Sequence, residues 1–188
     1  MALYELKNEQ IAITVDSHGA ELKSLKKLAD DQEYMWCGDA KFWGRTSPVL
    51  FPFVGGLKNK EYRFEGKTYS MTQHGFARDT EFEQIAAGED FVTYRLCADE
   101  ESKKKYPFDF VLEITHRLEN NRLSVEWNVK NVDDKEMYFT IGGHPAFNVN
   151  ILPDTDFEDY SLVFKEGIET LSYILIDAEN GTALTDKT

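Results

Sequence analysis

Two histidines stand in glycine-containing stretches that suit proton transfer. His74 is followed directly by Gly75 within residues 73–79, and His144 follows two glycines within residues 140–148. Histidine changes its charge close to neutral pH, so it can both donate and accept protons. Glycines allow a ligand to approach the backbone closely, and the proline after His144 favours an extended backbone at that histidine. The two stretches therefore predict general acid–base chemistry delivered from loops.

Structural alternatives stay open for both histidines. The stretch around His74 also fits a loop histidine that caps a strand end, and the stretch around His144 also fits a structural turn. A metal site is not favoured, because no second histidine or cysteine sits at ligand spacing from either one. His18 and His116 lie in unrelated contexts.

A third stretch, residues 43–60, is rich in proline, glycine and aromatic residues and contains Arg45 as its single arginine. Flat aromatic surfaces with a few fixed polar groups suit a sugar, whose ring has apolar C–H faces and polar edges. The same stretch also fits a buried loop whose arginine pairs with a carboxylate. Arg45 is therefore a candidate for substrate binding or for an ion pair.

The elements that must position these loops are strands. Apolar residues alternate with a period of two, as a half-buried strand requires. The clearest runs are residues 11–15, 91–96, 110–115 and 123–129. Turn signals rich in glycine, asparagine or aspartate occur at residues 65–67, 87–90, 119–122 and 132–135. Many short strands with regular turns predict an all-β, antiparallel sandwich or barrel.

The remaining segments add little helix. One short helix is expected near residues 99–105, where Pro107 would stop it. In the tail, residues 160–164 and 172–176 predict two further strands. There is no internal repeat and no linker, so residues 1–188 are predicted to form a single domain.

Composition and charge limit the classes of molecule that the chain is expected to bind. Aromatic residues make up 13% and hydrophobic residues 41% of the chain, which is a globular balance. The formal net charge of −13 repels phosphate backbones and anionic lipid, so neither nucleic acid nor a membrane is an expected partner. With only Cys37 and Cys97, and without a long apolar segment, the chain predicts no disulfide framework and a cytoplasmic location.

The three stretches and their order resemble the aldose 1-epimerase (galactose mutarotase) family. The resemblance is to its bacterial branch with the motifs His-Gly-Phe-Ala-Arg and Gly-Gly-His-Pro-Ala-Phe, found here at residues 74–78 and 142–147. It extends to residues 19–25 and 106–108, and so covers almost the whole chain. This resemblance implies an antiparallel β-sandwich of the galactose mutarotase-like supersandwich type, a small-molecule sugar as partner, and no cofactor.

The resemblance also implies residue roles. His144 matches the acid that protonates the ring oxygen, and His74 matches a second histidine that bonds the sugar near that oxygen. Asn59 and Lys60 lie where many members carry an Asn-Arg pair for sugar binding. Lys60 is a departure, because a point charge cannot form the planar fork of arginine, and Arg45 could replace that contact. The other predicted substrate-binding residues are Arg78 and Phe147.

A second departure concerns the base. In the family the base is a glutamate far towards the C-terminus, whereas this chain ends roughly where the last third of a member would begin. None of the late glutamates lies in a matching context; these are Glu158, Glu166, Glu169 and Glu179. The expectation is therefore the N-terminal two-thirds of such a sandwich, truncated at the C-terminus, with weak sugar binding and poor catalysis.

The favoured function is an isomerase that interconverts the α and β anomers of an aldohexose by acid–base ring opening. A hexose-6-phosphate 1-epimerase is an alternative, in which Arg45 and Arg78 clamp the phosphate. Two further alternatives are not enzymes: a non-catalytic carbohydrate-binding fragment and a purely structural sandwich. The sequence makes no prediction of oligomeric state.

Overall fold

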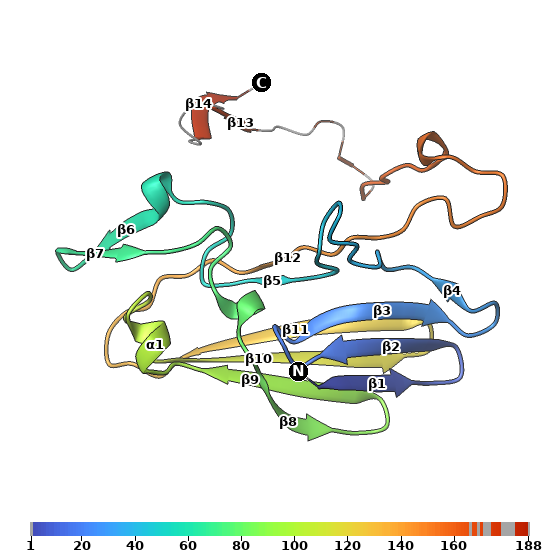
Figure 1. Cartoon of the computed structure of the whole chain (residues 1–188), viewed down its shortest axis with the longest axis horizontal. Coiled ribbons are helices and arrows are strands. Elements are labelled where there is room, and N and C mark those ends of the chain that lie inside the picture. Colours follow the sequence, from blue (N-terminus) through green and yellow to red (C-terminus); the bar gives the residue numbers. More distant parts are fainter. Residues whose placement is uncertain (1, 166, 169, 171–173, 178–182, 188) are drawn as a thin grey trace.

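The computed structural model describes residues 2–165, 167–168, 170, 174–177 and 183–187. Strands dominate it, and the longest two sheets each contain four antiparallel strands. The first sheet has the order β1-β2-β3-β4, with bounds Leu3–Lys7, Ile11–Asp16, Glu21–Lys27 and Gln32–Glu33. The second has the order β11-β10-β9-β8, with bounds Arg122–Asn131, Phe110–Glu119, Phe91–Cys97 and Glu83–Ala87. In Figure 1 the first sheet lies in front of the second.

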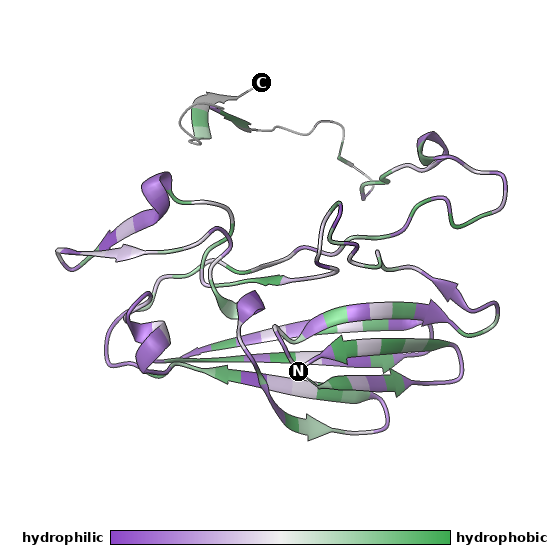
Figure 2. Ribbon diagram, viewed as in Figure 1, coloured by the Kyte–Doolittle hydropathy of each residue, from purple (hydrophilic) through white to green (hydrophobic). Residues whose placement is uncertain are grey.

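The two sheets enclose one apolar core. Burial alternates along β2, β9 and β10, as the period of two in the sequence predicts. Val15 of the first sheet and Tyr94 and Leu112 of the second are among the residues that this core buries almost completely. Figure 2 shows the same alternation as hydrophobic and hydrophilic bands along the strands. The predicted all-β sandwich is therefore confirmed.

The predicted turns and the predicted helix are also found. β10 and β11 pair in register from Phe110–Asn131 to Glu119–Arg122, so that residues 120–121 form a two-residue turn. The hairpin of β6 (Glu61–Phe64) and β7 (Lys67–Ser70) turns at residues 65–66. The helix α1 (Glu100–Lys103) begins after Asp99, whose carboxylate accepts the Ser102 N–H at 2.7 Å. None of the described helices is long and apolar enough to cross a membrane.

A smaller layer lies beside the two sheets and carries the candidate site. β5 (Val49–Leu50) pairs with β12 (Gly142–Gly143), two segments that are far apart in the sequence (Figure 1). The short helical turns η1 (Lys58–Lys60) and η2 (Ala77–Asp79) follow β5 along the chain. Towards the C-terminus come η3 (Phe157–Asp159), β13 (Ile174–Ile176) and β14 (Ala183–Lys187), of which β13 and β14 pair with each other.

The predicted strand at residues 160–164 is wrong. This segment has no regular structure, and its side chains Leu162 and Val163 are 87% and 91% exposed. An apolar run forms a strand only where a neighbouring strand pairs with it, and no described strand lies beside this one. The other predicted tail strand is present in part as β13, while residues 172–173 lie outside the described residues.

One histidine sits inside the core and should make stability depend on pH. His116 is 2% exposed, its Nε2 lies 3.0 Å from the Ala20 carbonyl oxygen, and burial lowers its pKa to about 4. The unfolded chain takes up this proton near pH 6.5, whereas the folded chain stays neutral until about pH 4. His116 should therefore cause no stability loss above pH 6.5 and a growing loss between pH 6.5 and 4.

The full loss should be about 3 kcal/mol, because one unit of pKa difference corresponds to about 1.4 kcal/mol. Urea unfolding of the parent chain and of His116→Gln at several pH values measures it. The glutamine amide can still donate to Ala20 but does not titrate, so the difference between the two free energies of unfolding should change across this window. A difference that is constant from pH 7 to 4 would contradict the buried, neutral histidine.

Candidate active site

His74 is held in its loop by two hydrogen bonds with Gly55. The His74 N–H donates to the Gly55 carbonyl oxygen at 2.8 Å, and the Gly55 N–H donates to His74 Nδ1 at 3.0 Å. The backbone of His74 has a φ of 69°, a left-handed conformation that non-glycine residues keep only where the surrounding structure enforces it. The imidazole is therefore fixed relative to the segment that follows β5.

His144 directly follows β12 and is fixed from the β5 side. Gly143 pairs with Val49, and the His144 N–H donates to the Pro48 carbonyl oxygen at 3.1 Å. Its ring packs against the indole of Trp43, with ring centroids 5.0 Å apart and a tilt of 41°. His144 is nevertheless exposed, so a ligand can reach the imidazole.

The two imidazoles come together. The ring centroids of His74 and His144 are 5.9 Å apart, and the ring planes meet at 67°. Two separate loops therefore bring two imidazoles to one place. No group of three or more potential metal-ligating side chains is found in the described part of the chain.

The hydrogen bond from Gly55 determines how neutral His74 carries its proton. Since Nδ1 accepts this bond, the proton of the neutral ring sits on Nε2, which becomes a donor. Burial, and after it the positive charges of Arg78 and His144, lower the pKa of His74 and favour the neutral ring. His74 is thus prepared to donate a hydrogen bond from Nε2.

Two arginines and one carboxylate adjoin the histidines. Arg45 Nη2 lies 2.5 Å from Asp79 Oδ1, and Arg78 Nε lies 3.7 Å from Asp79 Oδ2. Arg78 also donates to the Gln73 carbonyl oxygen at 2.8 Å. Burial, and after it the charge of Arg45, lower the pKa of Arg78. The ion pair that the sequence left open for Arg45 is therefore present.

A buried carboxylate holds the backbone of the loop that carries Arg45. Glu21, at the start of β3, is 7% exposed and accepts the backbone N–H groups of Thr46 at 2.6 Å and Ser47 at 2.8 Å. It also lies 3.5 Å from Lys23 Nζ. Glu21 fixes the residues directly after Arg45, a positioning role that the sequence analysis did not assign. The signal for this role in the sequence was an acidic residue at a position that the strand buries.

Two of the predicted sugar-binding residues are exposed on a short helical turn. Asn59 and Lys60 form part of η1, are exposed, and have left-handed φ values of 56° and 57°. Within the described residues we find no interaction between them and His74 or His144.

Phe147 faces a different hollow. It is 59% exposed, pairs with Met35 through an isolated bridge, and lines a cavity of about 490 Å³ together with Trp127 and His116. Neither site histidine lines that cavity. Gly143 and Pro145, on either side of His144 in the sequence, do line it, so the substrate-binding role of Phe147 stays a prediction.

The family model of aldose 1-epimerase matches residues 2–181 of the chain. The chain belongs to the aldose 1-epimerase family. The two histidine loops described above are accordingly the candidate active site of a family member.

Several known proteins are similar to this chain over most of its length. The chromosomally encoded LacX protein of Lactococcus lactis subsp. lactis is 34% identical over 168 residues, which cover 86% of this chain and 56% of LacX. The X-ray structure of a galactose mutarotase related enzyme from Lactobacillus acidophilus is 35% identical, with a TM-score of 0.88 over 100% of this chain and 62% of that one. A galactose mutarotase-like protein from Lactobacillus casei is 41% identical, with a TM-score of 0.77 over 81% and 52%.

The chain thus spans between about half and two thirds of the length of these three relatives. Its two four-stranded sheets and its histidine loops lie within residues 2–181, which the family model matches. The galactose mutarotase-like fold that the sequence predicted is confirmed for this family member.

Proposed function

We propose that this chain carries the histidine half of a sugar isomerase site, which interconverts the α and β anomers of an aldohexose. The observation that carries the proposal is the approach of two imidazoles from separate loops to a centroid distance of 5.9 Å. Opening a pyranose ring requires a proton on its ring oxygen, and imidazole is the side chain best matched to that transfer at neutral pH. Membership of the aldose 1-epimerase family supports the same chemistry.

The two histidines take different roles in this proposal. His144, exposed beside the Trp43 indole, donates the proton to the ring oxygen as the ring opens. His74 donates a hydrogen bond from Nε2 to the sugar near the same oxygen, because Gly55 occupies its Nδ1. The ring of Trp43 offers an aromatic surface for the apolar face of the sugar.

The proposal assigns the base for the C1 hydroxyl to no described residue. Asp79, the carboxylate described beside the histidines, forms ion pairs with Arg45 and Arg78. Glu158 is exposed in η3, and Glu166, Glu169 and Glu179 lie outside the described residues. The proton on the C1 hydroxyl must therefore leave to a group that these residues do not identify.

We favour a neutral sugar over a phosphorylated one. Arg45 and Arg78, the two residues of the proposed phosphate clamp, both lie within ion-pair distance of Asp79. A carboxylate between two guanidinium groups cancels part of their charge and would repel a phosphate. The proposed site therefore has less excess positive charge than two free arginines would supply.

Exchange NMR between the two anomeric protons tests the function directly. With glucose, galactose and glucose 6-phosphate at equal concentration, we expect anomer exchange above the buffer rate for a neutral hexose, and less acceleration for the phosphate ester. Heat-denatured chain serves as the control. Exchange at the buffer rate for all three sugars would contradict an isomerase, and a preference for glucose 6-phosphate would contradict the neutral substrate.

A non-catalytic sugar-binding chain is the second candidate. It is favoured because Asp79, the carboxylate described beside the histidines, is already paired with Arg45 and Arg78. Calorimetry on the same samples separates the two. Sugar binding together with exchange at the buffer rate would support the binding chain and exclude the isomerase.

A further inference from the structure

One carboxylate joins the two arginines beside the histidine pair. Asp79 lies within ion-pair distance of Arg45 and of Arg78, and Arg45 Nη1 also donates to the Arg78 carbonyl oxygen at 3.4 Å. The side chain of Asp79 is 48% exposed, whereas those of Arg45 and Arg78 are 29% and 17% exposed. Within this cluster, the carboxylate is therefore the group that a ligand reaches most easily.

The backbone that carries Arg78 and Asp79 is held in place. Both residues belong to η2, and the Gly19 N–H, from the turn between β2 and β3, donates to the Thr80 carbonyl oxygen at 2.8 Å. A Cβ atom at Gly19 would lie 2.9 Å from the Arg78 carbonyl oxygen, so the two backbones are in close contact. Arg78 Nη2 donates to the Gln73 carbonyl oxygen at 2.8 Å. Arg78 therefore cannot turn away from Asp79 without breaking these contacts.

The cluster lies where a phosphate on the substrate would come. In the proposed function the ring oxygen of the sugar lies at His74 and His144, and in an aldohexose only the short C5–C6 arm separates that oxygen from a 6-phosphate. The positive charge of Arg78 lowers the pKa of His74, so the guanidinium group acts on this imidazole. Arg78 also bonds the carbonyl oxygen directly before His74. A 6-phosphate on such a sugar would therefore meet the charges of the cluster.

The carboxylate changes what the two arginines can bind. Arginine binds phosphate best with two parallel N–H groups, and Asp79 already occupies Nη2 of Arg45. The negative charge of Asp79 also repels a phosphate that approaches the guanidinium groups, and this repulsion is strong at short distance. A sugar hydroxyl carries no charge and can donate to a carboxylate. The cluster as it stands therefore accepts hydroxyl groups and disfavours phosphate.

We infer that Asp79 restricts this site to neutral sugars, because its charge keeps Arg45 and Arg78 from binding a sugar phosphate. The inference rests on the proposed function, which brings the C6 end of the sugar to the cluster. It assigns the choice between neutral and phosphorylated substrates to a single side chain.

Neutralising Asp79 tests the inference. Inorganic phosphate is titrated into the parent chain and into Asp79→Asn at a constant ionic strength of about 0.15 M, where distant surface charges are screened. Binding is followed through the NMR ring signals of His74 and His144, assigned with the alanine variants of each. Asp79→Asn should bind phosphate about tenfold more tightly or better, because the amide keeps the shape of the carboxylate without its charge. Asp79→Ser, a second neutral variant, should show the same direction of change.

A double variant identifies the groups that bind the phosphate. In the Asp79→Asn background, Arg45→Gln restores the net charge that the cluster has in the parent. Its phosphate affinity should therefore return to within about threefold of the parent value. A double variant that keeps the full gain would show that the arginines are not the phosphate ligands, and would overturn the inference. Circular dichroism of each variant confirms that it is folded.

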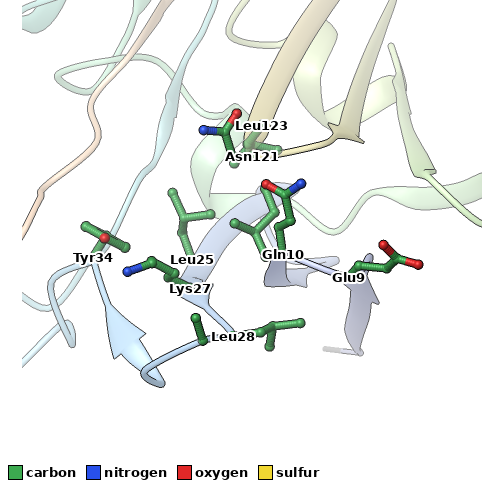
Figure 3. A pocket seen from close by; sticks show the side chains of 10 residues that line it. Glu9, Gln10, Leu25, Lys27, Leu28, Tyr34, Asn121 and Leu123 are labelled. Carbon is green, nitrogen blue, oxygen red and sulfur yellow. The ribbon is translucent and has the colours of Figure 1, made fainter.

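A carboxylate beside another hollow provides the matched control. The side chain of Asp30 is 52% exposed, and its Oδ2 lies 2.6 Å from Lys27 Nζ. Lys27 lines a hollow of about 590 Å³, shown in Figure 3, whose lining residues do not include His74 or His144. Asp30→Asn makes the same change of charge as Asp79→Asn. It should leave both phosphate binding and anomer exchange with glucose within about threefold of the parent.

Failure of the inference and failure of the proposed function give different results. A phosphate affinity of Asp79→Asn within about threefold of the parent, or an equal gain in Asp30→Asn, would overturn the inference even where glucose anomers exchange rapidly. A parent chain without anomer exchange would contradict the isomerase, while the phosphate comparison needs no turnover and still decides the role of Asp79. In an active chain, Asp79→Asn should raise the exchange rate of glucose 6-phosphate relative to that of glucose about tenfold or more, and an unchanged ratio would overturn the inference.

Discussion

Replacing His144 with alanine should lower the protein-catalysed rate of anomer exchange by about 10²–10⁴-fold, the range typical of one positioned acid or base. The imidazole packs on Trp43 while remaining exposed, so its removal should affect chemistry far more than folding. His74→Ala should lower the rate as well, because it removes the donor that Gly55 orients through Nδ1. The measurement is exchange NMR on glucose or galactose at neutral pH.

A histidine outside the site provides the matched control. His18 is partly exposed and lies 3.6 Å from Glu81. His18→Ala should leave the exchange rate within about threefold of the parent. If His144→Ala keeps the full rate while remaining folded, the assignment of His144 as the acid is wrong.

The alternation of apolar residues was sufficient to predict most of the fold. β2, β9 and β10 each have one face on the core side, so burial imposes a period of two on their sequences. The turns of the β10–β11 and β6–β7 hairpins carry asparagine or glycine where φ is positive, at Asn120 and Gly66. Local chemistry and burial agree in these elements, which is why the sequence alone predicts them.

Elements without a burial period could not be predicted. β5 and β12 contain two residues each, and their pairing depends on the loops that deliver them. The error at residues 160–164 has the opposite cause, since an apolar pattern is present there but a pairing strand is not among the described residues. An apolar pattern indicates which face a segment can bury, whereas strand pairing depends on whether another strand lies beside the segment.

The same distinction between sequence pattern and spatial neighbours applies to the candidate site. Residue type and glycine context singled out His74 and His144, but only the structure shows that their rings meet. Glu21 was missed because its role is exerted through backbone N–H groups of a loop that is distant in sequence. Contacts between a side chain and a remote backbone leave no periodic trace in the sequence.

Replacing Gly75 with alanine should destabilise the fold by about 4 kcal/mol or more, a value reserved for the most disruptive single substitutions. Gly75 has a φ of 74°, and a Cβ atom there would lie 2.1 Å from the Phe51 carbonyl oxygen and 2.7 Å from the Pro52 nitrogen. The same oxygen accepts the N–H groups of Phe76 and Ala77 at 3.0 and 3.2 Å, so it cannot withdraw without breaking them. Urea unfolding of the variant and the parent measures the loss.

Gly66→Ala separates the steric clash from backbone strain. Gly66 has a similar φ of 77°, but a Cβ atom there would meet nothing within 4 Å. The Gly66→Ala variant should therefore lose only about 1–2 kcal/mol of its free energy of unfolding, which is the cost of a left-handed conformation in a non-glycine residue. Equal losses in the two variants would show that contact with Phe51 contributes nothing. The larger expected loss at Gly75 follows from the same close approach of backbones that sets His74 beside Gly55, so one glycine secures both the packing of the loop and the position of its imidazole.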